Sequence, residues 1–308
     1  MKLRLLALLL LFASYACVAQ TAPAHPEMVV STQWLADHLN SPNVVVLHVA
    51  EKKSDYDAGH IPGARYLGFD DFMDVHSPKM YELPSPEKLK AVFEKLGVSD
   101  NSRVVIYTQD WFPWASRAWF TFEYLGHGLQ AALLDGGYKQ WEHEKRATTK
   151  DEPAAAKQGS FTPHPNAEDV ALLGQVKPLS ESGGNDGKNF LVDARSAKRY
   201  GDGHLSGATN IFWRSTVVSE DSPTLLPADQ LRKMWTDAGF KPGEKSISYC
   251  EVGIQASHDY FVAKYVGFDA AMYDGSFHEW EMLEKLPAVK GSAKTGPLVP
   301  SKGDMMNQ

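Results

Sequence analysis

Cysteine is scarce in this sequence of 308 residues, which contains only Cys17 and Cys250. Cys17 lies in an apolar N-terminal stretch, so cleavage after Ala19 would leave Cys250 as the only thiol. A single cysteine cannot form an internal disulfide, which excludes a fold held by disulfides. Cys250 is therefore either an inert buried thiol or a reactive one.

The chain also lacks an excess of positive charge. It has 31 Lys and Arg against 38 Asp and Glu, a formal net charge of -7. A nucleic-acid surface needs a basic patch, so we expect no nucleic-acid partner. The histidines have neither metal-ligand spacing nor cysteine partners, and we expect no metal and no cofactor. The apolar content of 43% and charged content of 22% are typical of a soluble globular protein, and the length suits two domains.

The one long apolar run lies at the N-terminus, where residues 5–13 follow Lys2 and Arg4. Small residues up to Ala19 offer a cleavage site. This pattern predicts a signal peptide over residues 1–19, and therefore an exported and periplasmic protein. The apolar run is too short to cross a bilayer comfortably, so we expect no transmembrane span in the mature chain.

Lipid anchoring at Cys17 is a second route of export. The preceding Ala16 suits lipidation, but Ser14 stands where a large aliphatic residue is usual. Both routes take the protein out of the cytoplasm.

Two parts of the chain repeat the same short motifs in the same order. The pairs are "YDAGHIPGA" at 56–64 with "YGDGHLSGA" at 200–208, "VVIYTQD" at 104–110 with "SISYCEV" at 246–252, and "DGGYKQW" at 135–141 with "DGSFHEW" at 274–280. We predict a duplicated domain at residues 28–148 and 166–288. Residues 149–165 read as a polar linker and residues 289–308 as a C-terminal tail.

Each copy alternates strand and helix patterns. The runs "NVVVLHV", "RVVIYT", "NFLVDA" and "KSISYC" are typical of buried parallel strands. In "ADQLRKMWTDAGF", Leu231, Met234, Trp235 and Ala238 share one helical face, and Gly239 ends the helix. The alternation predicts tandem α/β domains, each a mostly parallel sheet with helices on both faces.

Cys250 ends one of these strands and precedes a turn containing Gly253. Ligands of open α/β sheets collect beyond the carboxyl ends of the strands. Backbone N–H groups of a turn at a helix N-terminus converge on one point, so they should stabilise an anion and lower the thiol pKa. Gly253 permits a backbone angle that other residues resist. The geometry suits a thiolate or a persulfide, and a buried structural cysteine is the alternative.

Taken together, four features resemble the two-domain rhodanese-type sulfurtransferases, the family of thiosulfate and 3-mercaptopyruvate sulfurtransferases. They are the duplicated Gly-His-x-x-Gly-Ala, "LVDARSAKRY", the Cys-x-x-Gly turn and "YDGSFHEW". The resemblance covers nearly all of the mature chain. It implies tandem rhodanese-like domains with a persulfide-carrying cysteine in the second and no nucleophile in the first. Thr108 indeed aligns with Cys250, and Asp55 with Arg199.

The activity implied by the resemblance is transfer of a sulfane sulfur through a persulfide on Cys250. The donor is a small molecule such as thiosulfate, and the acceptor is cyanide, a thiol or a protein thiol. Arg199 matches the arginine that binds the anionic donor in this family, for which a guanidinium fork is suited. A plain surface charge is the alternative for Arg199. The backbone N–H groups that hold the persulfide are those of Glu251, Val252, Gly253, Ile254 and Gln255.

Other residues of the repeats are expected to be structural. His60 and His204 occur in both copies, including the copy without a nucleophile, and we do not place them in the site. Trp141 and Trp280 are expected in the core. Asp193 and Arg195 are predicted to form an internal pair, and Arg214 is a weaker pocket candidate.

Glu251 leaves the identity of the donor open. Relatives that favour thiosulfate carry basic residues after the cysteine, and those that favour 3-mercaptopyruvate carry a small uncharged pair. Glu251 and Val252 match neither pattern. A carboxylate beside a dianion costs about 1 kcal/mol per close contact near a surface. We therefore expect Glu251 to face solvent or to select a cationic or protein-borne acceptor, with 3-mercaptopyruvate as the alternative donor.

The sequence bears on two other classes of protein. Cysteine-dependent phosphatases use a Cys-x5-Arg loop, and Ala256 stands at the arginine position, which argues against phosphoryl chemistry. A persulfide carrier or sulfur-binding module without turnover remains the alternative to an enzyme.

Overall fold

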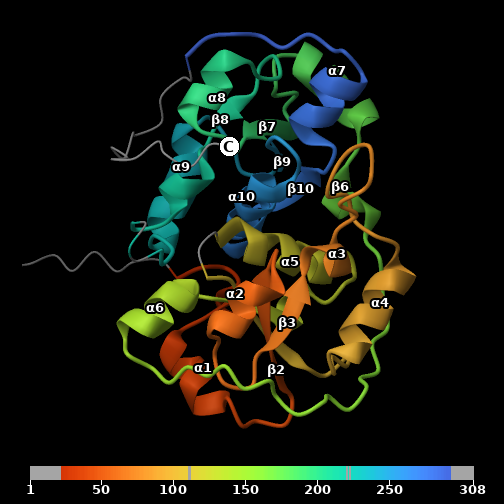
Figure 1. Cartoon of the computed structure of the whole chain (residues 1–308). Helices are drawn as coiled ribbons and strands as arrows, with labels where there is room; N and C mark the ends of the chain where they lie inside the picture. The colour runs from red at the N-terminus through yellow and green to blue at the C-terminus, as the bar shows by residue number, and fades with distance from the viewer. Residues whose placement is uncertain (1–21, 110–111, 220, 222, 293–308) are drawn as a thin grey trace, which may run out of the picture.

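Two α/β domains lie one above the other in the computed structural model (Figure 1). The structure describes residues 22–109, 112–219, 221 and 223–292. The predicted signal peptide at residues 1–19 and most of the predicted tail lie outside these residues.

The first domain contains a five-stranded sheet in the order β1-β5-β4-β2-β3, with every pair parallel. Its strands are β1 (Val29–Val30), β2 (Val44–Ala50), β3 (Arg65–Gly68), β4 (Arg103–Tyr107) and β5 (Ala131–Leu134). Its helices are α1 (Thr32–His38), α2 (Lys53–Ala58), α3 (Phe69–Phe72), α4 (Pro86–Lys95), α5 (Phe112–Tyr124) and α6 (Gly137–His143), with short 3₁₀ turns η1 (Pro26–Met28) and η2 (Gly128–Gln130).

The second domain repeats this plan with the order β6-β10-β9-β7-β8, again parallel throughout. Its strands are β6 (Val170–Ala171), β7 (Asn189–Asp193), β8 (Thr209–Asn210), β9 (Lys245–Tyr249) and β10 (Asp269–Tyr273). Its helices are α7 (Leu173–Glu181), α8 (Ala197–Asp202), α9 (Ala228–Asp237) and α10 (Ile254–Tyr265), with 3₁₀ turns η3 (Ala167–Asp169) and η4 (Trp213–Thr216) and a π-helical turn η5 (His278–Leu283). The identical strand order confirms the predicted fold class of tandem, mostly parallel α/β sheets.

Both faces of each sheet are buried. Successive strand residues point to opposite sides of the sheet, and the side chains on both sides lie in the core. Val45, Leu47 and Val49 of β2 belong to the core on one side, and Val46 belongs to the core on the other. The short apolar runs in the sequence thus form strands covered on both faces, as their composition predicted.

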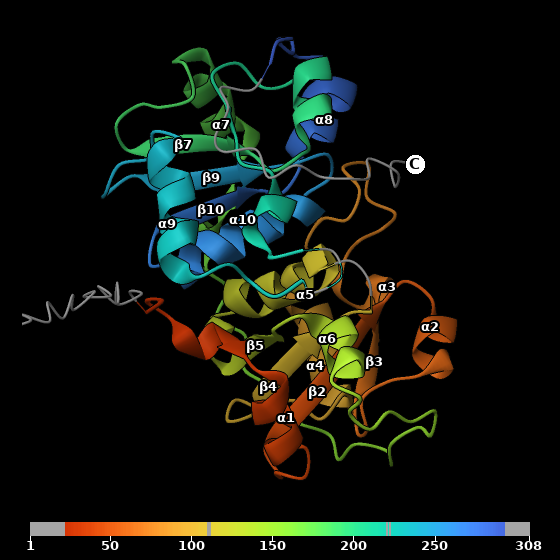
Figure 2. The same ribbon diagram turned by 90° about the vertical axis from the view of Figure 1, so that its left-hand side faces the viewer.

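Helices α5 and α10 form the central contact between the domains, and they lie side by side in both views (Figures 1 and 2). Trp119 of α5 packs edge-on against Phe261 of α10, with ring centroids 4.8 Å apart. Phe120 meets Tyr260 in the same way at 4.9 Å. One apolar core therefore runs from the first sheet through both helices to the second sheet.

His258 of α10 bridges the domains at the centre of this contact. Its ring is fully buried, with Nδ1 2.9 Å from Ser116 Oγ and Nε2 2.8 Å from Thr216 Oγ1. Thr216 donates its only hydroxyl proton to the Trp213 carbonyl, so Nε2 carries the ring proton and Nδ1 accepts from Ser116. Burial lowers the pKa of His258 to about 3, which keeps the ring neutral.

The duplicated histidines pack alike in the two domains. His60 stacks on Tyr56 and His204 on Tyr200, and each Nδ1 contacts the carbonyl of that tyrosine. The same contacts in a domain without a thiol agree with a structural role. The duplicated tryptophans are buried, as predicted.

Residues 149–165 contain no helix or strand, but they are bound to the first domain. Phe161 is buried against Phe93, and Thr162 bonds to Asp100 through both its N–H and its hydroxyl. The segment predicted as a polar linker is thus a surface segment that packs against the first domain.

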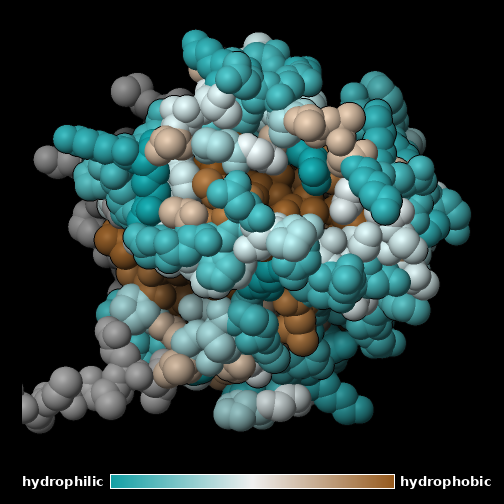
Figure 3. Space-filling model, turned by 90° about the horizontal axis from the view of Figure 1, so that it is seen from below, coloured by the Kyte–Doolittle hydropathy of each residue, from teal (hydrophilic) through white to brown (hydrophobic). Residues whose placement is uncertain are grey.

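The outer surface is mainly hydrophilic when the molecule is viewed from the end of the first domain, with apolar side chains visible in recesses (Figure 3). Within the described part of the chain, every helix is too short or too polar to cross a membrane.

The neutral His258 makes stability dependent on pH. An unfolded histidine takes up a proton near pH 6.5, whereas the folded ring resists protonation until about pH 3. Its contribution is complete above pH 6.5 and is lost as the pH falls. Between pH 6.5 and 4, the free energy of unfolding of the parent should therefore fall more steeply than that of His258→Gln. The difference in slope should be about 1.4 kcal/mol per pH unit. Denaturant unfolding of both proteins checks this, and parallel pH curves would contradict it.

Candidate active site

Cys250 lies directly after β9, at the carboxyl edge of the second sheet between the ends of β7 and β10. Its backbone N–H donates to Ser276 Oγ (3.2 Å), and its carbonyl accepts from the Phe277 N–H (3.0 Å). The Ser276 hydroxyl donates in turn to the Tyr273 carbonyl (2.8 Å). The loop after β10 therefore fixes the backbone of the cysteine on both sides.

A tight bend of Glu251, Val252 and Gly253 connects Cys250 to α10. Gly253 has φ 83° and ψ -9°, a left-handed conformation that favours glycine. A Cβ at this position would lie 2.8 Å from Asp274 Oδ1, so glycine is also required by space. Ile254 and Gln255, which the sequence places among the N–H donors of the turn, belong to the first turn of α10.

Backbone N–H groups of Ala256, Val252 and Gln255 face the sulfur of Cys250. Val252 and Gln255 belong to the set predicted from the sequence and Ala256 does not, while the N–H groups of Glu251, Gly253 and Ile254 are not among those facing the sulfur. The predicted lowering of the thiol pKa is nevertheless wrong for this structure. Cys250 is only 1% exposed, and burial raises its pKa more than the three N–H groups lower it. The carboxylate of Glu251 raises the pKa of Cys250 further.

Glu251 is half-exposed and ion-paired. Its Oε2 lies 3.2 Å from Nη1 of Arg195, whose Nη2 lies 2.7 Å from Asp193 Oδ2. The Arg195 guanidinium also covers the ring of Phe277 at 4.1 Å. The predicted internal pair of Asp193 and Arg195 is confirmed. The expectation that Glu251 faces solvent holds in part, because its carboxylate is half-exposed and also ion-paired with Arg195.

Arg199 lies on α8 with an exposed side chain. Its backbone N–H caps the helix on Ser196 Oγ. Within the described residues, its guanidinium makes no hydrogen bond or direct ion pair, and its charge acts on the nearby Asp202. Its role in binding the donor stays a prediction. The weaker candidate Arg214 is half-buried and lies over the Trp213 ring at 5.3 Å.

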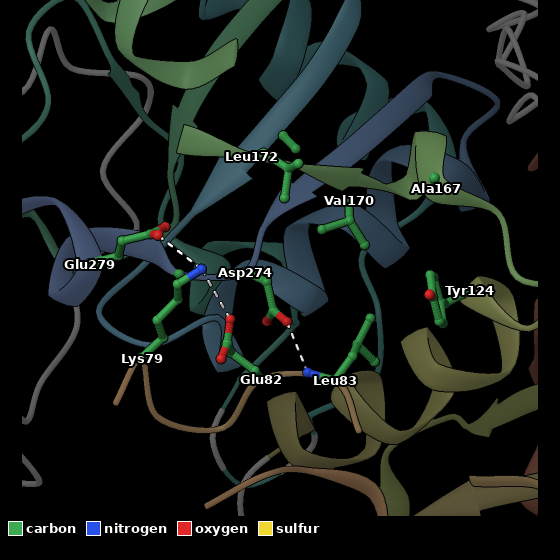
Figure 4. Close-up of a pocket in the computed structure, with 11 residues that line it drawn as sticks. Lys79, Glu82, Leu83, Tyr124, Ala167, Val170, Leu172, Asp274 and Glu279 are labelled. Carbon is green, nitrogen blue, oxygen red and sulfur yellow. Dashed lines mark hydrogen bonds and ion pairs between the residues drawn. The ribbon is translucent and has the colours of Figure 1, made fainter. Parts of the chain in front are cut away.

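A cavity of about 290 Å³ opens between the domains beside the loop that follows β10 (Figure 4). Lys79 bridges Glu82 (3.3 Å) and Glu279 (3.0 Å) at its edge. Asp274 lies inward, where its Oδ2 accepts the N–H of Leu83 at 3.0 Å. Cys250 does not line this cavity.

The carboxylate of Asp274 also receives an arginine from the first domain. Nη1 of Arg117, a residue of α5, lies 2.6 Å from Asp274 Oδ1, and the Arg117 side chain is fully buried. Sequence reasoning missed both this pair and Ser276. The repeat held a signal for Ser276, because the corresponding residue of the first domain is Gly137.

The same edge of the first domain has the scaffold without the thiol. The Thr108 carbonyl accepts the Tyr138 N–H (3.1 Å), as the Cys250 carbonyl accepts that of Phe277. The Tyr107 hydroxyl accepts the Ile61 N–H at 3.0 Å, and the Tyr249 hydroxyl accepts the Leu205 N–H at the same distance. Sulfur chemistry at a cysteine is therefore restricted to the second domain.

No group of three or more His, Cys, Asp or Glu side chains within the described ranges is arranged to hold a metal ion. The arrangement instead offers one thiol, a ring of N–H donors and a nearby network of buried ion pairs.

Known proteins share both the sequence pattern and the fold. The family model of the Rhodanese-like domain matches residues 31–144 and 175–283. The chain is 33% identical over 291 residues to the sulfur carrier protein TtuD of Thermus thermophilus, covering 87% of this chain and 98% of that protein. It is 30% identical over 292 residues to a thiosulfate sulfurtransferase of Corynebacterium glutamicum, covering 87% and 92%.

Among solved structures, the fold is similar to that of SseA from Escherichia coli, described as a 3-mercaptopyruvate sulfotransferase. The TM-score is 0.71 at 24% identity, covering 81% of this chain and 98% of SseA.

The buried thiol should react slowly with alkylating agents at neutral pH. We expect the pH midpoint for alkylation of Cys250 by iodoacetamide to lie above that of a free cysteine, about 8.5. Glu251→Gln removes a neighbouring negative charge and should lower this midpoint. Alkylation rates across pH 7 to 11 check both statements, and an unchanged midpoint in the variant would show that the carboxylate has no effect on the thiol.

Proposed function

The chain belongs to the rhodanese-like family of sulfurtransferases, and from this premise we propose that a persulfide on Cys250 carries the transferred sulfur. The donor is a sulfane-sulfur compound such as thiosulfate, and the acceptor is cyanide or a thiol. The observation that carries the proposal is a thiol at a strand end, enclosed by backbone N–H groups, in only one of two matching domains.

The first half-reaction loads the enzyme. The Cys250 thiolate attacks the outer sulfur of thiosulfate, the sulfur–sulfur bond of the donor breaks, and sulfite leaves with the bonding electron pair. In the second half-reaction, cyanide or a thiolate attacks the outer sulfur of the persulfide. Thiocyanate or a new persulfide leaves, and the Cys250 thiolate is restored.

The turn is suited to both anions formed at Cys250, the thiolate and the persulfide. The N–H groups of Val252, Gln255 and Ala256 stabilise negative charge on sulfur without carrying a net charge themselves. Burial opposes the free thiolate, so an approaching dianionic donor needs a cation. Arg199 is the residue that the family resemblance supports for this role, since its guanidinium is exposed and makes no direct ion pair with a described carboxylate, although its charge acts on the nearby Asp202.

Cyanide serves as an assay acceptor, and the natural acceptor is proposed to be a cationic or protein-borne thiol. Arg195 holds Glu251 beside the bend, and almost half of the Glu251 side chain remains exposed. A fixed carboxylate at this edge favours a positively charged partner over a free anion.

A persulfide carrier without multiple turnover is the second candidate function. The relative from Thermus thermophilus is named a sulfur carrier protein, and the closed position of Cys250 agrees with a stored rather than a freely exchanged sulfur. Turnover with thiosulfate or 3-mercaptopyruvate as donor, and with cyanide or a dithiol as acceptor, separates the two candidates. We further propose export to the periplasm, on the pattern of residues 1–19 alone.

The nucleophile is tested by mass. Incubation with thiosulfate should add one sulfur, about 32 Da, to the parent protein and none to Cys250→Ser. Intact-protein mass spectrometry checks this. The same addition to the variant would remove Cys250 from the mechanism.

The role of Arg199 is tested by kinetics. Loss of a charge-assisted contact in Arg199→Ala should lower kcat/KM for thiosulfate by about 10- to 100-fold, mainly through the donor KM. The dependence on acceptor concentration should change little. Lys198→Ala is the matched control, because Lys198 is an exposed cation on the same helix that is paired with Asp202. Equal donor KM values in both variants would make Arg199 an ordinary surface charge.

A further inference from the structure

We propose that the first domain positions the Cys250 turn through the ion pair between Arg117 and Asp274, so that Arg117 is a positioning residue for sulfur transfer. This inference rests on the proposed function of Cys250. It assigns a task to the domain that lacks a nucleophile.

The arginine end of the pair is rigidly held. Arg117 is fully buried in α5, donates from Nη1 to Asp274 Oδ1, and donates from Nη2 to the carbonyl of Tyr81. Tyr81 and the preceding Met80 have φ values of 58° and 61°, a region that is unfavourable for non-glycine residues. Such a conformation persists only where surrounding contacts hold it, and such strain gathers at functional sites.

The aspartate end leads directly to the cysteine. Asp274 packs beneath Gly253, the last residue of the bend that carries the Val252 N–H. The residues that follow it hold the nucleophile by its backbone. Ser276 accepts the Cys250 N–H and Phe277 donates to the Cys250 carbonyl.

Residues 78–83 of the first domain contact the loop 274–279 at several points, in part at the cavity edge visible in Figure 4. Lys79 pairs with Glu279, and the Leu83 N–H donates to Asp274. The ring of His278 contacts the Pro78 carbonyl at 3.1 Å, while the His278 N–H donates to the Glu251 carbonyl. The loop 274–279 is thus bound to the first domain on one side and to the Cys250 turn on the other.

The duplication supplies an internal comparison. Asp135 is the counterpart of Asp274, and its carboxylate likewise accepts an N–H from the other domain, that of Leu225 at 2.9 Å. The counterpart of Arg117 is Asp259, since each lies nine residues after the aligned positions 108 and 250. Asp259 is buried, and neither carboxylate oxygen has a hydrogen-bond partner among the described groups. Among the described residues, the ionic link is therefore present at the loop that holds Cys250 and absent at its counterpart.

A loosened loop 274–279 would misalign the Cys250 sulfur with the N–H groups that face it, and it would leave Arg199, the proposed binding residue for thiosulfate, unchanged. The expected signature is a fall in kcat with little change in donor KM, because a displacement of about 1 Å at a reacting group can cost up to 100-fold in rate.

The experiment compares two isosteric substitutions in the full-length protein, Asp274→Asn and Asp135→Asn. Each keeps an oxygen that accepts the N–H from the other domain, and only the first removes an ion pair. With thiosulfate and cyanide, Asp274→Asn should lower kcat by about 10- to 100-fold with the donor KM within about 2-fold, whereas Asp135→Asn should change both by less than about 2-fold. Equal kcat values in two folded variants would overturn the inference.

Substitutions at the other end of the pair keep the test decisive if Asp274→Asn fails to fold. Arg117→Gln should reduce kcat as Asp274→Asn does, and Arg117→Lys, which keeps the charge, should recover most of it. Equal kcat values for the Gln and Lys variants, with equal melting temperatures, would also overturn the inference. Sulfur loading of the parent is measured in parallel by mass. Failure of the parent to load Cys250 would count against the proposed function, and equal variants on a loading parent would count against the positioning role alone.

Discussion

The packing of α5 against α10 is the interaction on which the rest of the structure depends. Each helix follows the central strand β4 or β9 of its sheet, so their contact joins the two carboxyl edges across one apolar core. Ser116 and His258 occupy equivalent positions and contact each other, as expected near an axis that relates duplicated domains. Polar groups in this core must be paired or neutral. His258 is neutral, and Arg117 is paired with Asp274.

This packing encloses Cys250 and creates a conflict at the site. A thiolate needs donors or positive charge, while burial disfavours any charge. The structure resolves the conflict only in part, because three N–H groups face the sulfur and the pKa of Cys250 is still raised. A dianionic donor would add to this burden, so the proposed transfer of sulfur needs a positive charge near Cys250, the role that we propose for Arg199.

Much of the fold could be predicted because it follows from short-range patterns. Buried strands, helical faces and repeated motifs fixed the class and the duplication, and the end of β9 pointed to Cys250. Contacts between distant residues could not be read in this way. The pairing of Arg117 with Asp274 joins positions 157 residues apart, and that of Arg195 with Glu251 spans 56. The prediction of a lowered pKa for Cys250 was wrong for a related reason. The N–H groups of the local turn lower this pKa, but burial in the surrounding core raises it more.

A crystal structure of the protein after reaction with thiosulfate tests the central claim most directly. The account predicts a second sulfur bonded to Sγ of Cys250, within hydrogen-bond distance of the N–H groups of Val252, Gln255 or Ala256, and Thr108 unmodified. An unmodified Cys250 in protein that transfers sulfur in the same solution would contradict the account.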